Sequence, residues 1–176
     1  MVILNVIRSL LDRLFVIIGA FIGSQVPEFI HQYSQRLAGH VDELQRLLNQ
    51  MSQSAHYSNK TLEQYIHKFL ISSDPDFSNQ GQFMHGMLLR WEELNQALNQ
   101  LTTSSLLIRP YVFVKGIQYD IFRATLNSYQ PGINFSIEGV CYVILGALIG
   151  WIGYYLVSKC IHFGSSRALA IFKQSY

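Results

Sequence analysis

The six histidines of this chain are its residues with the most obvious chemical potential, because imidazole can bind a metal or transfer a proton. Glu63 and His67 are spaced i,i+4, which places two possible metal ligands on one helix face. Zinc needs a third and a fourth ligand, and the neighbouring sequence supplies neither, so we interpret these residues as a surface pair. A hydrolase elbow, a phosphate-binding loop, a dinucleotide fingerprint and a zinc-protease motif are also missing from the sequence. We therefore expect no enzyme activity, no cofactor and no bound metal.

Pairs of glycines spaced by four residues form the clearer pattern. Gly19 and Gly23 lie in one apolar stretch of the chain, and Gly146 and Gly150 lie in another. Small residues at this spacing let two helix backbones approach closely inside a membrane, where hydrophobic exclusion does not drive helices together. The sequence predicts that these four glycines pack membrane spans, either within one chain or between copies.

The second of these stretches predicts a transmembrane helix. Between Glu138 and Lys159 lie the 19 uncharged residues Gly139 to Val157. At ~1.5 Å per helical residue, such a run nearly crosses a hydrocarbon core of ~30 Å. Only 14% of the residues of the whole chain are charged, whereas about 25% is usual for a soluble domain. The composition is therefore typical of a small membrane protein.

The first apolar stretch permits two interpretations. In the one we favour, a retained helix begins at the membrane interface and crosses the membrane through Phe15 to Gly23, with Arg13 reaching back to the interface. In the other, the stretch is a signal peptide cleaved at the small residues of Ile22-Gly23-Ser24.

Basic residues flank both predicted spans on the sides that face away from the central segment. Arg8 and Arg13 precede the first span, and Lys159, Arg167 and Lys173 follow the second. Since short flanks rich in lysine and arginine stay in the cytoplasm, we expect both termini to be cytoplasmic. In a bacterium the central domain would then be periplasmic. The net charge of +2 is too small and too dispersed to indicate a nucleic-acid partner.

The central segment carries two apolar stripes with heptad-like spacing. The first consists of Leu37, Val41, Leu44, Leu48, Met51 and Ala55, and the second of Met84, Met87, Trp91, Leu94, Leu98 and Leu101. Such stripes predict two helices that pack as a hairpin resembling a coiled coil, or as part of a small helical bundle. The expected fold is an all-α membrane protein. Its predicted parts are a transmembrane helix with a basic flank at 1–27, a helical extramembrane domain at 28–132, a second transmembrane helix at 133–158 and a basic cytoplasmic tail at 159–176.

Two further helices are predicted in the central segment. One runs from Thr61 to Ile71 and ends at the turn-forming sequence Ser72-Ser73-Asp74-Pro75-Asp76. The other begins near Pro110 and runs until Pro131-Gly132, although residues 106–114 could also contain a short strand.

Several segments carry a resemblance to a known family: Ser24-Gln25-Val26-Pro27-Glu28-Phe29, the stretch Gln32 to Glu43, Tyr129-Gln130-Pro131-Gly132, Glu138-Gly139 and Gly146 to Gly150. In these segments the chain resembles an uncharacterised family of two-span proteobacterial inner-membrane proteins, known only as a domain of unknown function. The resemblance implies a bacterial inner membrane but supplies no activity or ligand. The segment from Gln25 to Glu43 is unusually polar for a membrane exit, so Gln25, Arg36, His40 and Glu43 are candidate partner contacts, with helix capping and solvation as the structural alternative.

Two functions fit these observations. The first is a membrane-anchored structural or interaction protein whose helical periplasmic domain self-associates or docks on another membrane protein. The second is a lipid-binding or small-molecule-binding accessory of envelope transport, with an apolar groove lined by Phe83, Met84, Met87 and Trp91. Membrane lipid is an expected partner in both cases.

Overall fold

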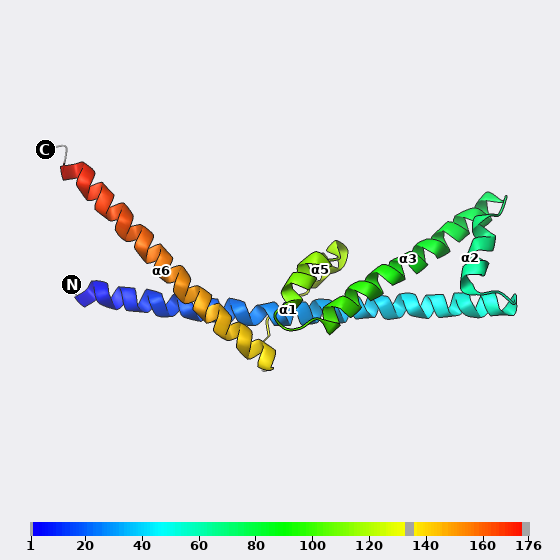
Figure 1. The fold of residues 1–176 in the computed structure, drawn as a ribbon, viewed down its shortest axis with the longest axis horizontal. Helices are drawn as coiled ribbons and strands as arrows, with labels where there is room; N and C mark the ends of the chain where they lie inside the picture. Colours follow the sequence, from blue (N-terminus) through cyan, green and yellow to red (C-terminus); the bar gives the residue numbers. More distant parts are fainter. Residues whose placement is uncertain (1, 133–135, 174–176) are drawn as a thin grey trace. The chain divides into compact units, whose positions relative to one another are not determined.

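The chain is helical in its computed structural model, which describes the backbone of residues 2–132 and 136–173 and the side chains of residues 9–132 and 136–159. Within these residues lie six helices and no strand (Figure 1). The helices are α1 (Val2–Tyr57), α2 (Leu62–Leu70), α3 (Pro75–Thr103), α4 (Arg109–Lys115), α5 (Tyr119–Asn127) and α6 (Ile137–Lys173). The predicted all-α fold is thus confirmed. Two helices, over Ser9–Tyr57 and Ile137–Lys159, are long and apolar enough to cross a membrane.

The chain divides into two compact units. The span unit comprises Met1–Phe29 and Gln130–Tyr176, and the central unit comprises Ile30–Tyr129. These bounds lie a few residues inside the central domain predicted at 28–132. The start of the second span predicted at 133–158 and the end of the basic tail predicted at 159–176 lie outside the described residues. Apart from Ser136, which precedes the helix, the remainder of both segments belongs to α6, which extends to Lys173.

The predicted boundary at residue 27 is not a break in the backbone, because α1 continues through Pro27. A proline inside a helix removes the hydrogen bond to the carbonyl four residues earlier, which here belongs to Gly23. Ser24 and Ile30, three residues before and after the proline, are both buried. Packing on both sides of Pro27 outweighs its local cost, as tertiary contacts commonly outweigh propensity.

The core of the central unit is built from both apolar stripes. Leu37 and Val41 of α1 belong to the same buried cluster as Leu94 and Leu101 of α3. Each such side chain contributes about 1.5–3 kcal/mol when it is fully buried. Neither helix can bury its own stripe, so the stripes stabilise the unit only when α1 and α3 share this core.

The second helix has the bounds that the sequence predicted. Thr61 and Gln64 form a capping box, in which the Thr61 hydroxyl accepts from the Gln64 amide at 3.3 Å and the Gln64 side chain accepts from the Thr61 amide at 3.2 Å. The helix ends with Ile71 as its C-cap. The next helix, α3, begins after Asp74, whose carboxylate accepts from the Asp76 amide at 2.9 Å.

The single helix predicted from Pro110 to Pro131-Gly132 is wrong. The structure instead has two short helices, α4 and α5, separated at Gly116. Gln118 adopts an extended conformation, and its backbone amide donates to the Tyr33 hydroxyl at 2.9 Å rather than to a helix carbonyl. Residues 109–115 are helical, which excludes the alternative of a strand over residues 111–114.

Candidate functional site

The four predicted packing glycines meet at one contact inside the span unit. An ideal Cβ added to Gly19 would overlap the Gly146 carbonyl oxygen and lie 2.9 Å from the Gly150 Cα. One added to Gly23 would lie 2.9 Å from the Gly146 Cα. All these neighbours are backbone atoms, so no side-chain rearrangement could make room for the added carbon. Figure 1 shows α6 crossing the N-terminal part of α1, and the glycines lie where the two backbones touch. The structure therefore forms this contact within one chain.

Large apolar side chains occupy the outward faces of the same two helices. Ile17, Phe21 and Ile22 of α1 are exposed, as are Leu148 and Ile149 of α6. Glycines at the helix contact and bulky apolar residues outside it are the arrangement expected of helices surrounded by lipid. A soluble helix pair would place its largest apolar residues in the contact instead.

Gln25, the first of the candidate partner contacts, is engaged within the span unit. Its amide nitrogen donates to the Ser24 hydroxyl at 2.8 Å and to the Gly132 carbonyl at 3.3 Å. The Ser24 hydroxyl in turn donates to the Phe21 carbonyl at 2.7 Å. The polar side chain of Gln25 thus forms a hydrogen bond with Gly132, in the segment that precedes α6.

The other three candidates, Arg36, His40 and Glu43, follow i,i+4,i+7 spacing along one side of α1 in the central unit. The Arg36 guanidinium donates to the Ser128 hydroxyl at 2.6 Å, and both residues line an open hollow of about 390 Å³. His40 is exposed. The Glu43 carboxylate forms an ion pair of 2.7 Å with Arg46, and the hydrogen bonds from Arg46 lower the pKa of Glu43. Arg36 therefore contributes to packing against the end of α5, while His40 remains accessible.

The apolar groove predicted at Phe83, Met84, Met87 and Trp91 is not an open surface. Met84 is buried, and Trp91 packs against the central cluster. Phe83 is exposed on a different side of α3. Met84 and Trp91 therefore contribute to packing inside the unit, and the lipid-binding function stays a prediction.

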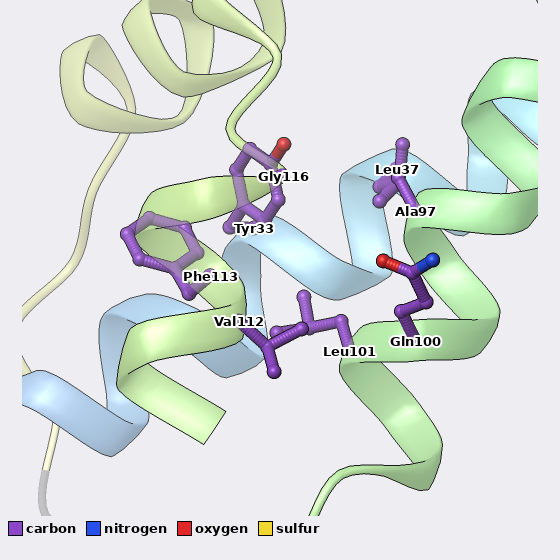
Figure 2. A pocket seen from close by; sticks show the side chains of 8 residues that line it. All are labelled: Tyr33, Leu37, Ala97, Gln100, Leu101, Val112, Phe113 and Gly116. Atoms are coloured by element: carbon purple, nitrogen blue, oxygen red, sulfur yellow. The ribbon is translucent and has the colours of Figure 1, made fainter. Parts of the chain in front are cut away.

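A small space in the same core surrounds Tyr33 (Figure 2). Its volume of about 10 Å³ is room for roughly one water molecule. Figure 2 shows Phe113 of α4 beside Tyr33, and Val112 of α4 beside Leu101. The Tyr33 and Phe113 rings meet edge to face with centroids 5.0 Å apart. Burial raises the pKa of the Tyr33 hydroxyl, although the hydrogen bond from Gln118 opposes this shift. The space is too small for a metabolite, and the side chains around it pack α4 against α1.

Sequence reasoning missed an aromatic hollow between α2 and α3. It measures about 270 Å³ and is lined by Lys68, Phe69, Ser72 and Phe77. The ring centroids of Phe69 and Phe77 are 5.8 Å apart, and Tyr65 adds a third ring 5.1 Å from Phe69. The i,i+4 spacing of Tyr65 and Phe69 was the available signal, but the approach of Phe77 depends on the turn before α3.

Glu63 and His67 are both exposed on α2. Among the residues with described side chains, no three histidine, cysteine, aspartate or glutamate residues lie close enough together to hold a metal ion. Cys141 is a free, exposed thiol.

Comparison with known families places most of the chain in one family model. The profile of DUF2937, described as a protein of unknown function, matches residues 7–167. Neither the curated proteins nor the solved structures contain a significant match.

Proposed function

The chain belongs to the DUF2937 family, and we propose that it is a two-span membrane protein that presents its helical central unit for docking, either to a second copy or to another membrane protein. Its site of action is the inner membrane of a bacterium, with both termini in the cytoplasm and the central unit in the periplasm. The single observation that carries the proposal is the glycine contact between α1 and α6, together with the bulky apolar side chains that these helices turn outward.

The free energy of exposed apolar surface favours a lipid environment for these helices. Apolar surface costs about 25 cal/mol per Å² when it is left in water. Phe21 and Ile22 of α1 and Leu148 and Ile149 of α6 are each at least half exposed. In a bilayer this surface faces acyl chains and carries no such cost.

The glycine contact also favours a retained first helix over a cleaved signal peptide. Cleavage after Gly23 would remove the α1 residues that touch Gly146 and Gly150. The remaining span would then expose a glycine-lined seam with nothing packed against it.

Reporter fusions test this topology. We expect cytoplasmic signals from fusions after Ser9 and after Tyr176, and a periplasmic signal from a fusion near Ser78, because lysine and arginine concentrate in the outer flanks. A periplasmic signal at Tyr176 would invert the proposed topology. Mature protein that begins near Gln25 would establish the cleaved signal peptide instead.

Docking must use a surface other than the glycine seam, because that seam is already occupied within one chain. The side of α1 that carries Arg36, His40 and Glu43 is the candidate surface, and His40 and Glu43 are its exposed members. Within the chain, Arg36 donates to the Ser128 hydroxyl at 2.6 Å and Glu43 pairs with Arg46 at 2.7 Å, whereas no such bond from the described residues engages the exposed His40 ring.

A photoreactive amino acid at His40 tests the docking surface in native membranes. Gln82, which is exposed on α3 of the same unit, provides the matched control position. We expect a discrete adduct at His40 that is missing at Gln82; an adduct of twice the monomer mass identifies a second copy, and another mass identifies a different protein. Monomer alone at His40, or equal adducts at both positions, would contradict the proposal.

A further inference from the structure

The segment around α4 turns an unusual set of apolar side chains toward solvent. Leu107 is 86% exposed, Tyr111 is 67% exposed and Val114 is 69% exposed. We call these three residues, with Ile108, the α4 face. The backbone already winds helically before α4, since the Ser105 carbonyl accepts from the amides of Ile108 at 3.1 Å and Arg109 at 2.9 Å. Positions 107, 108, 111 and 114 therefore share one side of a continuous helical segment.

The opposite side of α4 accounts for its packing in the central unit. Val112 and Phe113 contact the core cluster, and Figure 2 shows both beside Tyr33 and Leu101. Because α4 already packs on the core through Val112 and Phe113, the α4 face is not needed for the packing of the central unit.

The stretch of sequence between Glu93 and Asp120, which contains the α4 face, carries positive charge only. The 26 residues from Leu94 to Tyr119 contain no aspartate or glutamate, and their only charged residues are Arg109 and Lys115. Lys115 is exposed on the same side of α4 as Tyr111. Apolar and tyrosine side chains combined with lysine or arginine are typical of segments that lie in the interface of a membrane.

α4 packs against the first turns of α1 in the central unit, which begins at Ile30. α4 packs on Tyr33, and Gln118, just after α4, donates its amide to the Tyr33 hydroxyl at 2.9 Å. Tyr33 follows Phe29, the last α1 residue of the span unit, by only four residues within α1. The α4 face therefore belongs to the part of the central unit that the chain reaches first after the membrane span.

We propose that the α4 face rests on the surface of the bilayer and binds anionic lipid, with Leu107 and Tyr111 in the interface and Lys115 beside the headgroups. A second copy of the chain is a poorer occupant, because it would bring its own Lys115 against the Lys115 of the first copy. An anionic surface instead complements Lys115, the basic residue on this side of α4, whereas the Arg109 guanidinium donates to the Ser104 carbonyl at 3.2 Å. This inference rests on the proposed membrane anchoring but goes beyond the proposed docking function.

Spin labels on the full chain in lipid nanodiscs test the contact. Cys141 and Cys160 are first replaced by serine, and a label is attached at Tyr111→Cys or, as a control, at Phe83→Cys. Phe83 is 63% exposed on α3, which matches Tyr111 in exposure and apolar character. Discs are made from phosphatidylcholine alone or with added phosphatidylglycerol, and the accessibility of each label to oxygen and to a water-soluble nickel chelate is measured.

We expect the label at position 111 to favour oxygen over the nickel chelate, most strongly in anionic discs, while the label at position 83 remains in water. Lys115→Gln should lower the ratio of docked to free α4 about fivefold in anionic discs, the effect of removing one basic residue at a membrane surface. Labels at 111 and 83 with equal accessibility would overturn the proposal, as would equal lipid contact in both disc types. A label at 111 shielded from both reagents would also overturn it, because it would indicate a protein partner. Failure of the chain to enter discs would instead count against the membrane-anchored function.

Discussion

Replacing Gly146 with alanine should separate α1 from α6. An ideal Cβ at this position would overlap the Gly19 carbonyl oxygen and lie 2.9 Å from the Gly23 Cα. Both neighbours are backbone atoms, so the helices themselves must move apart. Overpacking of this kind costs about 1–3 kcal/mol, which corresponds to roughly 5- to 150-fold in the equilibrium between packed and separated spans.

Gly153 supplies the matched control on the same helix. A Cβ at Gly153 would meet no atom within 4 Å. Both substitutions add the same methyl group to α6 and change its helix propensity equally, so the difference between them isolates the contact with α1. We expect Gly153→Ala to leave the packing of the spans unchanged.

Crosslinking between the two spans measures the effect. The rings of Phe15 and Tyr154 flank the contact with centroids 5.8 Å apart, so cysteines at these positions should react with a short bifunctional thiol reagent. Native cysteines are replaced by serine, and the crosslinking yield is followed as SDS is titrated into mild detergent. The midpoint should fall for Gly146→Ala and not for Gly153→Ala. Equal midpoints for the two variants would refute the reasoning that backbone contact at Gly146 holds the spans together.

Three further predictions concern the central unit, each followed by thermal unfolding of the full chain in detergent. Gly81→Ala should destabilise the unit by about 1–3 kcal/mol, because its Cβ would lie 2.8 Å from the Phe69 carbonyl carbon; Gly86→Ala, which meets nothing within 4 Å, should not, and equal effects would contradict this. Tyr33→Phe should lower the free energy of unfolding by about 1–3 kcal/mol, because it leaves the Gln118 amide without its acceptor. Unchanged hydrogen exchange at the Gln118 amide in this variant would contradict the prediction. Because burial raises the folded-state pKa of Tyr33, its contribution is complete below the unfolded pKa near 10 and falls as pH rises further; a Tyr33→Phe variant with the same alkaline loss would disprove this assignment.

The local rules of helix formation were readable in the sequence. The two apolar stripes at heptad spacing predicted that α1 and α3 would each bury one side, and Leu37 and Leu94 are buried in one cluster. The helix predicted to start at Thr61 does so, with Thr61 as its N-cap. Such features depend on residues a few positions apart, so their geometry is determined by helix periodicity alone.

The break between α4 and α5 required a contact that sequence spacing does not reveal. Gly116 weakens the helix there, but many helices contain a glycine. The decisive partner is the Tyr33 hydroxyl, 85 residues away in the chain, which accepts the amide of Gln118. The break also allows Val112 and Phe113 to reach the core while Tyr111 remains outside.

The glycine contact separates most clearly what the sequence determines from what the tertiary structure determines. The four-residue spacing of Gly19 and Gly23, and of Gly146 and Gly150, determined from the sequence alone that each helix has a face without side chains. That spacing is equally suited to a partner helix of the same chain or of another copy. Only the tertiary structure decided between them, because the Gly19 backbone meets that of Gly146 within one molecule and excludes a second helix from the same seam.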